Sequence, residues 1–70
     1  MKPFELQAEI AKKGLSIPRL AEMIGISKKA FYEKLSGKTE FKRNEILSIK
    51  ETLGISDDRL LEIFFADDVS

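Results

Sequence analysis

Hydrophobic residues recur at intervals of three and four positions along most of the chain, which is the spacing of one face of an α-helix. Four glycines, at positions 14, 25, 37 and 54, divide this pattern into five segments. Glycine is favoured just after a helix because it adopts a left-handed conformation without strain. The pattern therefore predicts one all-α domain over residues 1–70. Its helices are expected at about 4–13, 17–24, 28–36, 43–53 and 57–65.

Serine residues stand directly before three of the expected helices, at Ser16, Ser27 and Ser56. A serine hydroxyl at this position accepts a hydrogen bond from a free N–H of the first turn. Pro18 lies in the first turn of the second helix, where its missing N–H costs nothing. These residues predict where the three helices begin. After the last helix, residues 67–70 are expected to fray.

Composition narrows the possible functions. The chain has no cysteine and no histidine, which excludes disulfides, thiol chemistry and the commonest zinc sites. It also lacks a nucleophile motif and a phosphate-binding glycine loop, so we expect no enzyme, no cofactor, no metal and no small-molecule ligand. No apolar run reaches membrane-spanning length and no secretory signal is visible. We therefore expect a cytoplasmic protein with no membrane partner.

The formal net charge is zero, but the charges are unevenly distributed. Residues 1–50 contain eleven Lys and Arg against six Asp and Glu, whereas residues 51–70 contain one Arg against six acids. A basic body with an acidic C-terminal segment is compatible with a DNA-binding face on one side. A chance imbalance in a neutral protein would give the same pattern.

Only Gly25 and Ile26 separate the second helical segment from Ser27, the cap of the third. Two helices joined so tightly cross steeply, which requires a small residue where they meet and a glycine in the turn. Ala21 and Gly25 satisfy both requirements. Apolar residues that can hold the pair on the rest of the domain are Leu20, Ile24, Ile26 and Phe31. This spacing predicts a helix-turn-helix over residues 16–35.

At these residues the sequence resembles the lambda-repressor-like family, the Cro-type, XRE-like helix-turn-helix regulators of phages and bacteria. The segments that carry the resemblance are Gly14-Leu15-Ser16, residues 20–27, Ser36-Gly37-Lys38 and Leu53-Gly54-Ile55-Ser56. Residues 31–35, Glu40-Phe41 and residues 63–65 look most like small phage or prophage members. The resemblance implies a compact five-helix DNA-binding domain with the motif at its second and third helices. It also implies a repressor-type regulator of transcription.

On a helical wheel, the third helix turns Phe31 and Leu35 inward and Lys29 and Tyr32 outward. In this family the N-terminal residues of that helix contact base edges in the major groove of a double-stranded DNA operator. The candidates for base contact are Ser27, Lys28, Lys29 and Tyr32. The alternative is an ordinary solvated face with two lysines.

A second set of polar residues surrounds the following loop and the start of the fourth helix, with one more on the second helix. Cations and helix-start N–H groups there can bind phosphates. The candidates for phosphate contact are Arg19, Lys38, Thr39, Lys42, Arg43 and Asn44, and a solvated loop is again the alternative. Glu33 would repel phosphates unless it accepts from a cytosine amino group or pairs with Lys29, and we favour the surface pair.

Two positions depart from the family pattern. Ile17 stands where members often have a glutamine that meets a phosphate, and Lys34 stands where an apolar residue is usual. Leu35 is expected to replace the missing apolar contact by pairing with Phe31, which would rotate the third helix slightly about its axis.

The last helix carries apolar residues over a broad arc. This surface is either a wide core contact or a homodimer interface, which a palindromic operator would require. The candidates for such an interface are Leu61, Ile63 and Phe65. Two functions stay open at this point. One is a sequence-specific regulator, either a whole Cro-like protein or the N-terminal domain of a longer repressor, and the other is a protein-interaction adaptor that has lost DNA contact.

Overall fold

The computed structural model describes residues 1–65, and within this range the chain forms helices and no strand. In chain order the helices are α1 (Pro3–Lys12), α2 (Ile17–Ile24), α3 (Lys28–Leu35), α4 (Arg43–Leu53) and α5 (Asp57–Phe64). The all-helical prediction is confirmed for these residues, and every helix begins and ends within one residue of its expected position. The expected fraying of residues 67–70 lies outside the described part of the chain.

Polar groups at the helix starts explain why the helices begin where they do. Ser16, Ser27 and Ser56 each accept a hydrogen bond from the backbone N–H three residues later, at 3.1 to 3.2 Å. No serine precedes α4. There the carboxylate of Glu45 accepts from the backbone N–H of Lys42 at 2.8 Å, which is the N3 half of a capping box.

The connection from α2 to α3 is a tight turn at Gly25, which has a φ of +83°. The N–H of Ile26 donates to the carbonyl of Ala21 at 3.0 Å, and the N–H of Gly25 donates to Glu22 at 3.2 Å. This pair of bonds is a Schellman motif, which ends a helix and requires a left-handed residue. The chain therefore leaves α2 abruptly and begins α3 after Ser27.

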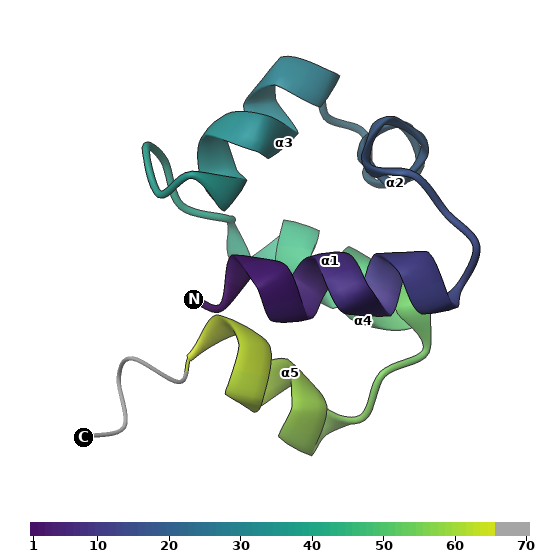
Figure 1. Ribbon diagram of the computed structural model, residues 1–70. Coiled ribbons are helices and arrows are strands. Elements are labelled where there is room, and N and C mark those ends of the chain that lie inside the picture. The colour runs from purple at the N-terminus through teal and green to yellow at the C-terminus, as the bar shows by residue number, and fades with distance from the viewer. Residues whose placement is uncertain (66–70) are drawn as a thin grey trace.

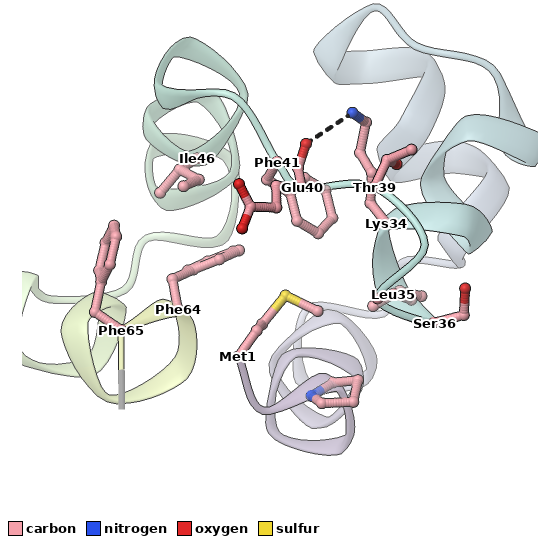
Figure 2. Close-up of a pocket in the computed structure, with 12 residues that line it drawn as sticks. Met1, Lys34, Leu35, Ser36, Thr39, Glu40, Phe41, Ile46, Phe64 and Phe65 are labelled. Carbon is pink, nitrogen blue, oxygen red and sulfur yellow. Dashed lines mark hydrogen bonds between the residues drawn. The ribbon is translucent and has the colours of Figure 1, made fainter. Parts of the chain in front are cut away.

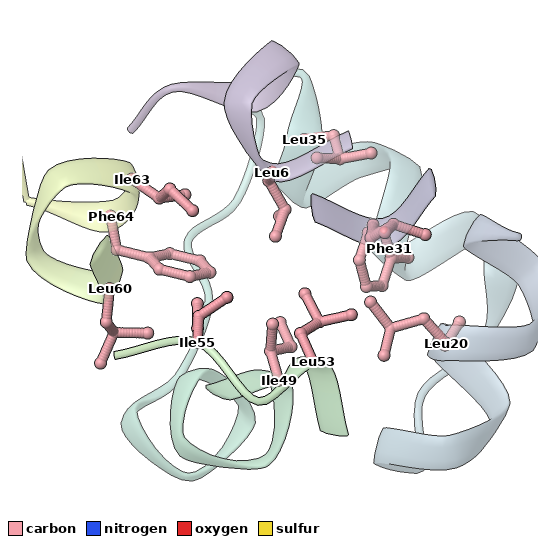
Figure 3. Close-up of a cluster of buried hydrophobic side chains, with 12 residues drawn as sticks. Leu6, Leu20, Phe31, Leu35, Ile49, Leu53, Ile55, Leu60, Ile63 and Phe64 are labelled. Atoms are coloured by element: carbon pink, nitrogen blue, oxygen red, sulfur yellow. The ribbon is translucent and has the colours of Figure 1, made fainter. Parts of the chain in front are cut away.

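The helices enclose one apolar core. In Figure 1, α1 and α4 occupy the middle of the molecule, with α2 and α3 on one side and α5 on the other. Every helix contributes buried side chains, and the largest fully buried ones are Phe31, Leu6, Leu20, Ile49, Leu53 and Ile63 (Figure 3). Among the described helices, none combines the length and the apolar character that crossing a bilayer would need.

The guanidinium of Arg59 joins α5 to α1. It donates to Glu5 and to Glu9, both at 2.9 Å, and also pairs with Glu62 on its own helix. The hydrogen bond from Arg59 lowers the pKa of Glu9 below its ordinary value, and a further pair with Lys12 acts in the same direction. α5 is thus fixed on α1 by charge-assisted hydrogen bonds as well as by apolar packing.

Candidate functional site

The face of α3 that points away from the core carries three of the predicted base-contacting residues. Phe31 and Leu35 are buried, as the helical wheel predicts. Lys28 and Lys29 are exposed at the start of the helix, and Tyr32, one turn further on, is 46% exposed. Within residues 1–65 neither lysine takes part in an ion pair. The start of α3 therefore presents two free ammonium groups and one phenol to solvent.

Three other predicted residues already have partners within the chain. The hydroxyl oxygen of Ser27 accepts a hydrogen bond from the N–H of Ala30, and the hydroxyl can still donate its own proton to another acceptor. Arg19 pairs with Glu22 on α2. The ammonium of Lys38 lies 3.5 Å from the carboxylate of Glu33. The positive charges of Arg19 and Lys38 are therefore partly neutralised.

The expected surface pair of Glu33 exists, but its expected partner is wrong. Glu33 pairs with Lys38 in the loop after α3, not with Lys29 on the same helix. The backbone brings the loop back toward the helix, because the N–H of Lys38 donates to the carbonyl of Glu33 at 3.0 Å. Lys29 therefore has no ion-pair partner in the described part of the chain.

The start of α4 carries the second group of exposed polar residues. Lys42, Arg43 and Asn44 are all exposed, as is Thr39 in the preceding loop. Neither Lys42 nor Arg43 forms an ion pair with any residue between positions 1 and 65. Free cations therefore flank the first N–H groups of α4, where the helix dipole also favours an anion. Figure 1 shows the loop that joins this region to the end of α3.

Lys34 and Glu45 form a buried ion pair that was not predicted from the sequence. The side chain of Lys34 is only 11% exposed and that of Glu45 only 9%, and Nζ of Lys34 lies 3.4 Å from Oε1 of Glu45. The same ammonium donates to the carbonyl of Glu40 at 3.1 Å (Figure 2). An acid three residues after the N-cap is a known capping signal, so the hydrogen bond that Glu45 accepts at the start of α4 could be predicted from the sequence. The ion pair between Lys34 and Glu45 could not be predicted, because it joins two different helices.

A groove of about 440 Å³ lies between the N-terminus, the α3–α4 loop and the end of α5 (Figure 2). Its walls are mixed, with Met1, Phe41 and Phe64 beside the polar Lys34 and Glu40. Among residues 1–65, no buried side-chain nitrogen or oxygen lacks a hydrogen-bond partner. Among the described residues, the groove therefore contains no buried polar group that needs a ligand to complete its hydrogen bonds.

Exposed apolar side chains on α4 and α5 form a further surface feature, called here the apolar face. Leu47, Leu61 and Phe65 are 45%, 55% and 38% exposed. A second cavity of about 380 Å³ opens beside Leu47 and Phe65. The prediction that Ile63 belongs to an interface is wrong, because its side chain is fully buried in the core. Leu47 belongs to this face but was not predicted.

Over residues 1–65 the fold consists of five helices, one of which, α3, presents cations at the surface. No family model, no curated protein and no solved structure matches the chain. Its function is therefore inferred from the residues and their arrangement.

Proposed function

We propose that this chain is a sequence-specific, double-stranded DNA-binding regulator of transcription. In this proposal α2 and α3 form a helix-turn-helix of the lambda-repressor-like type, and α3 enters the major groove. The observation that carries the proposal is the tight turn at Gly25 followed by a helix whose exposed start bears Lys28 and Lys29, which form no ion pair with any of residues 1–65. A helix held on the core by one apolar face, with free donors on the other, is suited to insertion into a groove.

The two groups of polar residues would have different tasks. Lysine can donate to O6 and N7 of guanine, and a tyrosine hydroxyl can donate to a base acceptor or a phosphate. The base-contacting set is Ser27, Lys28, Lys29 and Tyr32. Phosphate contacts fix the register of a protein on the duplex without selecting a sequence. The set proposed for them is Arg19, Lys38, Thr39, Lys42, Arg43 and Asn44.

The apolar face supports a homodimer as the DNA-binding form. Leu47, Leu61 and Phe65 expose apolar surface on two neighbouring helices, and burial of such surface drives association. A dimer with two-fold symmetry would place two copies of α3 on the two halves of a palindromic operator. A repressor of phage or prophage type would act in this way.

Fluorescence polarisation tests the proposal directly. The full chain is titrated onto a labelled mixed-sequence duplex at low salt and again at rising salt. We expect binding whose affinity falls steeply with salt, because bound phosphates release counterions. Selection from a random duplex pool should then enrich one palindromic sequence. Absence of any binding at low salt would overturn the proposal.

A protein-interaction adaptor is the second candidate function. It is favoured by the zero net charge and by the acids that neutralise Arg19 and Lys38. In this case the apolar face of α4 and α5 would bind another protein. The low-salt titration separates the two functions, since an adaptor would leave even mixed-sequence duplex unbound.

A further inference from the structure

Lys34 occupies the last turn of α3, yet its side chain points toward the core side of the molecule instead of toward solvent. Its ammonium has three neighbours: the carbonyl of Glu40 at 3.1 Å, the carboxylate of Glu45 at 3.4 Å and the ring of Phe41 at 5.9 Å from its centroid (Figure 2). These neighbours belong to the loop after α3 and to α4. Lys34 therefore connects the end of α3 to the two segments that follow it.

Glu45 connects the same point to the start of α4. Its Oε1 atom both lies beside the ammonium of Lys34 and accepts from the backbone N–H of Lys42. Within residues 1–65, the pair of Lys34 with Glu45 is the one ion pair that joins α3 to α4. A single oxygen atom thus links the helix proposed to contact bases with the helix start proposed to bind phosphates.

Other contacts hold α3 less directly on α4. The helix against which α3 packs most extensively is α2. The ring of Phe41 lies between Phe31 of α3 and Phe64 of α5, with edge-to-face centroid distances of 5.3 and 5.6 Å. Edge-to-face packing of this kind fills the space between the helices. It allows the helices to slide or rotate relative to one another more readily than a hydrogen-bonded ion pair does. α2 packs against both α3 and α4, and the direct polar link between α3 and the start of α4 is the pair of Lys34 with Glu45.

We infer that Lys34 and Glu45 are positioning residues that fix α3 relative to the start of α4, so that base and phosphate contacts can form at the same time. The inference rests on the proposed function, but neither residue needs to touch DNA. The Lys34–Glu45 pair therefore contributes to discrimination between DNA sequences. Non-specific binding depends on the free surface cations and should be independent of this pair.

The double variant Lys34→Met with Glu45→Gln tests this role. Removing one charge alone would leave its partner buried and uncompensated, whereas replacing both avoids that cost. The side chains keep almost the same volume, the net charge is unchanged, and the glutamine Oε1 can still accept from the N–H of Lys42. The matched control is Lys50→Met with Asp57→Asn, which removes a pair of 3.2 Å between α4 and α5.

The first measurement needs no DNA. Residual dipolar couplings of backbone N–H groups in the free protein report the orientation of α3 relative to α4. We expect the double variant to change this orientation or to broaden its distribution, and the control to match the wild type. Unchanged couplings in the double variant would overturn the inference whatever the protein does with DNA.

The second measurement compares two duplexes: the sequence that the wild type selects from a random pool and a mixed sequence of equal length. We expect the double variant to lose about tenfold in the ratio of the two affinities, which is the scale of one mismatched base pair. Its affinity and salt dependence on mixed sequence should stay unchanged. An unchanged ratio would overturn the inference. Failure of the wild type to bind would overturn the proposed function and, with it, the role of the pair in discrimination, while its role in orienting α3 is decided by the couplings alone.

The single variant Glu45→Gln is a second test, in which the ammonium of Lys34 loses its counter-charge but keeps two oxygen acceptors, the carbonyl of Glu40 and the glutamine amide. Its amide oxygen can accept from both Lys34 and Lys42, so every hydrogen bond keeps an acceptor. The attraction between the two charges is lost. We expect altered couplings and a smaller fall in the affinity ratio, and a wild-type result in both measurements would contradict the positioning role.

Discussion

The carboxylate of Glu33 lies 3.5 Å from the ammonium of Lys38, so a cation proposed for phosphate contact carries its own counter-charge. Arg19 stands in the same relation to Glu22 on α2. Exposed pairs of this kind contribute little to folding. Their main effect is on the surface potential, because each acid reduces the positive charge that its partner can offer to DNA.

Glu33→Gln and Glu22→Gln should therefore strengthen DNA binding. Each change frees one cation, and a freed cation that neutralises one phosphate steepens the plot of log affinity against log salt by about 0.9. Polarisation titrations on mixed-sequence duplex at several salt concentrations measure this slope. The fold should be unaffected, since both acids have exposed surface.

Glu51→Gln is the matched control, because Glu51 is exposed on α4 and pairs with no residue between positions 1 and 65. It changes the net charge by the same amount but frees no cation. If all three variants gain the same affinity for DNA, the change in net charge explains the gain and the two ion pairs have no special role.

Lys29→Ala and Arg43→Ala should affect binding in different ways. Loss of a base contact lowers affinity for the selected sequence by about 1–3 kcal/mol and relaxes the preference at one position. Loss of a phosphate contact weakens all sequences about equally and reduces the salt slope by about 1. We therefore expect Lys29→Ala to reduce discrimination and Arg43→Ala to preserve it. Titrations on the selected and the mixed duplex measure both effects.

Unchanged binding of the selected duplex by Lys29→Ala would contradict the base-contacting role of this residue. Uniform weakening by that variant would instead move Lys29 to the phosphate-contacting set.

Helix bounds and the inner face of α3 could be predicted from the sequence because local chemistry decides them. A serine cap accepts from an N–H three residues away, and Gly25 adopts a positive φ that other residues rarely adopt. Phe31 and Leu35 are one helical turn apart, so burying one places the other on the same side. None of these features depends on how the helices are arranged in space.

Contacts between distant elements could not be predicted in the same way. The partner of Lys34 is Glu45, on another helix, and only the path of the α3–α4 loop brings the two together. Similarly, periodicity shows that α5 has a broad apolar arc but not which part of it the other helices cover. Packing against the other helices buries Ile63 and leaves Leu61 exposed, and periodicity alone does not distinguish the two positions.

Acidification should destabilise the fold partly through Glu9. Its pKa is lowered in the folded state by the hydrogen bond from Arg59, so the folded state binds this proton less readily than the unfolded chain does. The contribution of ionised Glu9 to the free energy of unfolding is therefore complete above the unfolded pKa of about 4.3. It is lost as the pH falls through the lower pKa of the folded state. Arg59→Gln should lower the melting temperature by a few degrees at pH 7 and lose less stability on acidification than the wild type.

Thermal melts of both proteins at pH 7 and at about pH 3 measure the difference. Glu9→Gln serves as a control, because it removes the titrating group and leaves the bonds of Arg59 to Glu5 and Glu62 in place. An equal loss of stability in wild type and Arg59→Gln between the two pH values would contradict the assigned coupling.

Ile63→Ala and Leu61→Ala should separate folding from self-association. Ile63 is fully buried, so its truncation leaves a cavity and should cost about 2–4 kcal/mol of folding free energy in urea unfolding. Leu61 is 55% exposed, so its truncation should change that free energy by less than about 0.5 kcal/mol. It should instead weaken the dimer, because it removes apolar surface from the proposed interface.

Sedimentation equilibrium at several protein concentrations measures the association, and Leu47→Ala with Leu61→Ala should weaken it further than either change alone. A wild type that stays monomeric at every concentration would contradict the dimer. Unfolding data that rank Leu61→Ala as the more damaging variant would contradict the orientation of α5 itself. The two measurements report on opposite faces of one helix, because Ile63 faces the core and Leu61 faces solvent. A helix rotated about its axis would exchange these roles and reverse both results together.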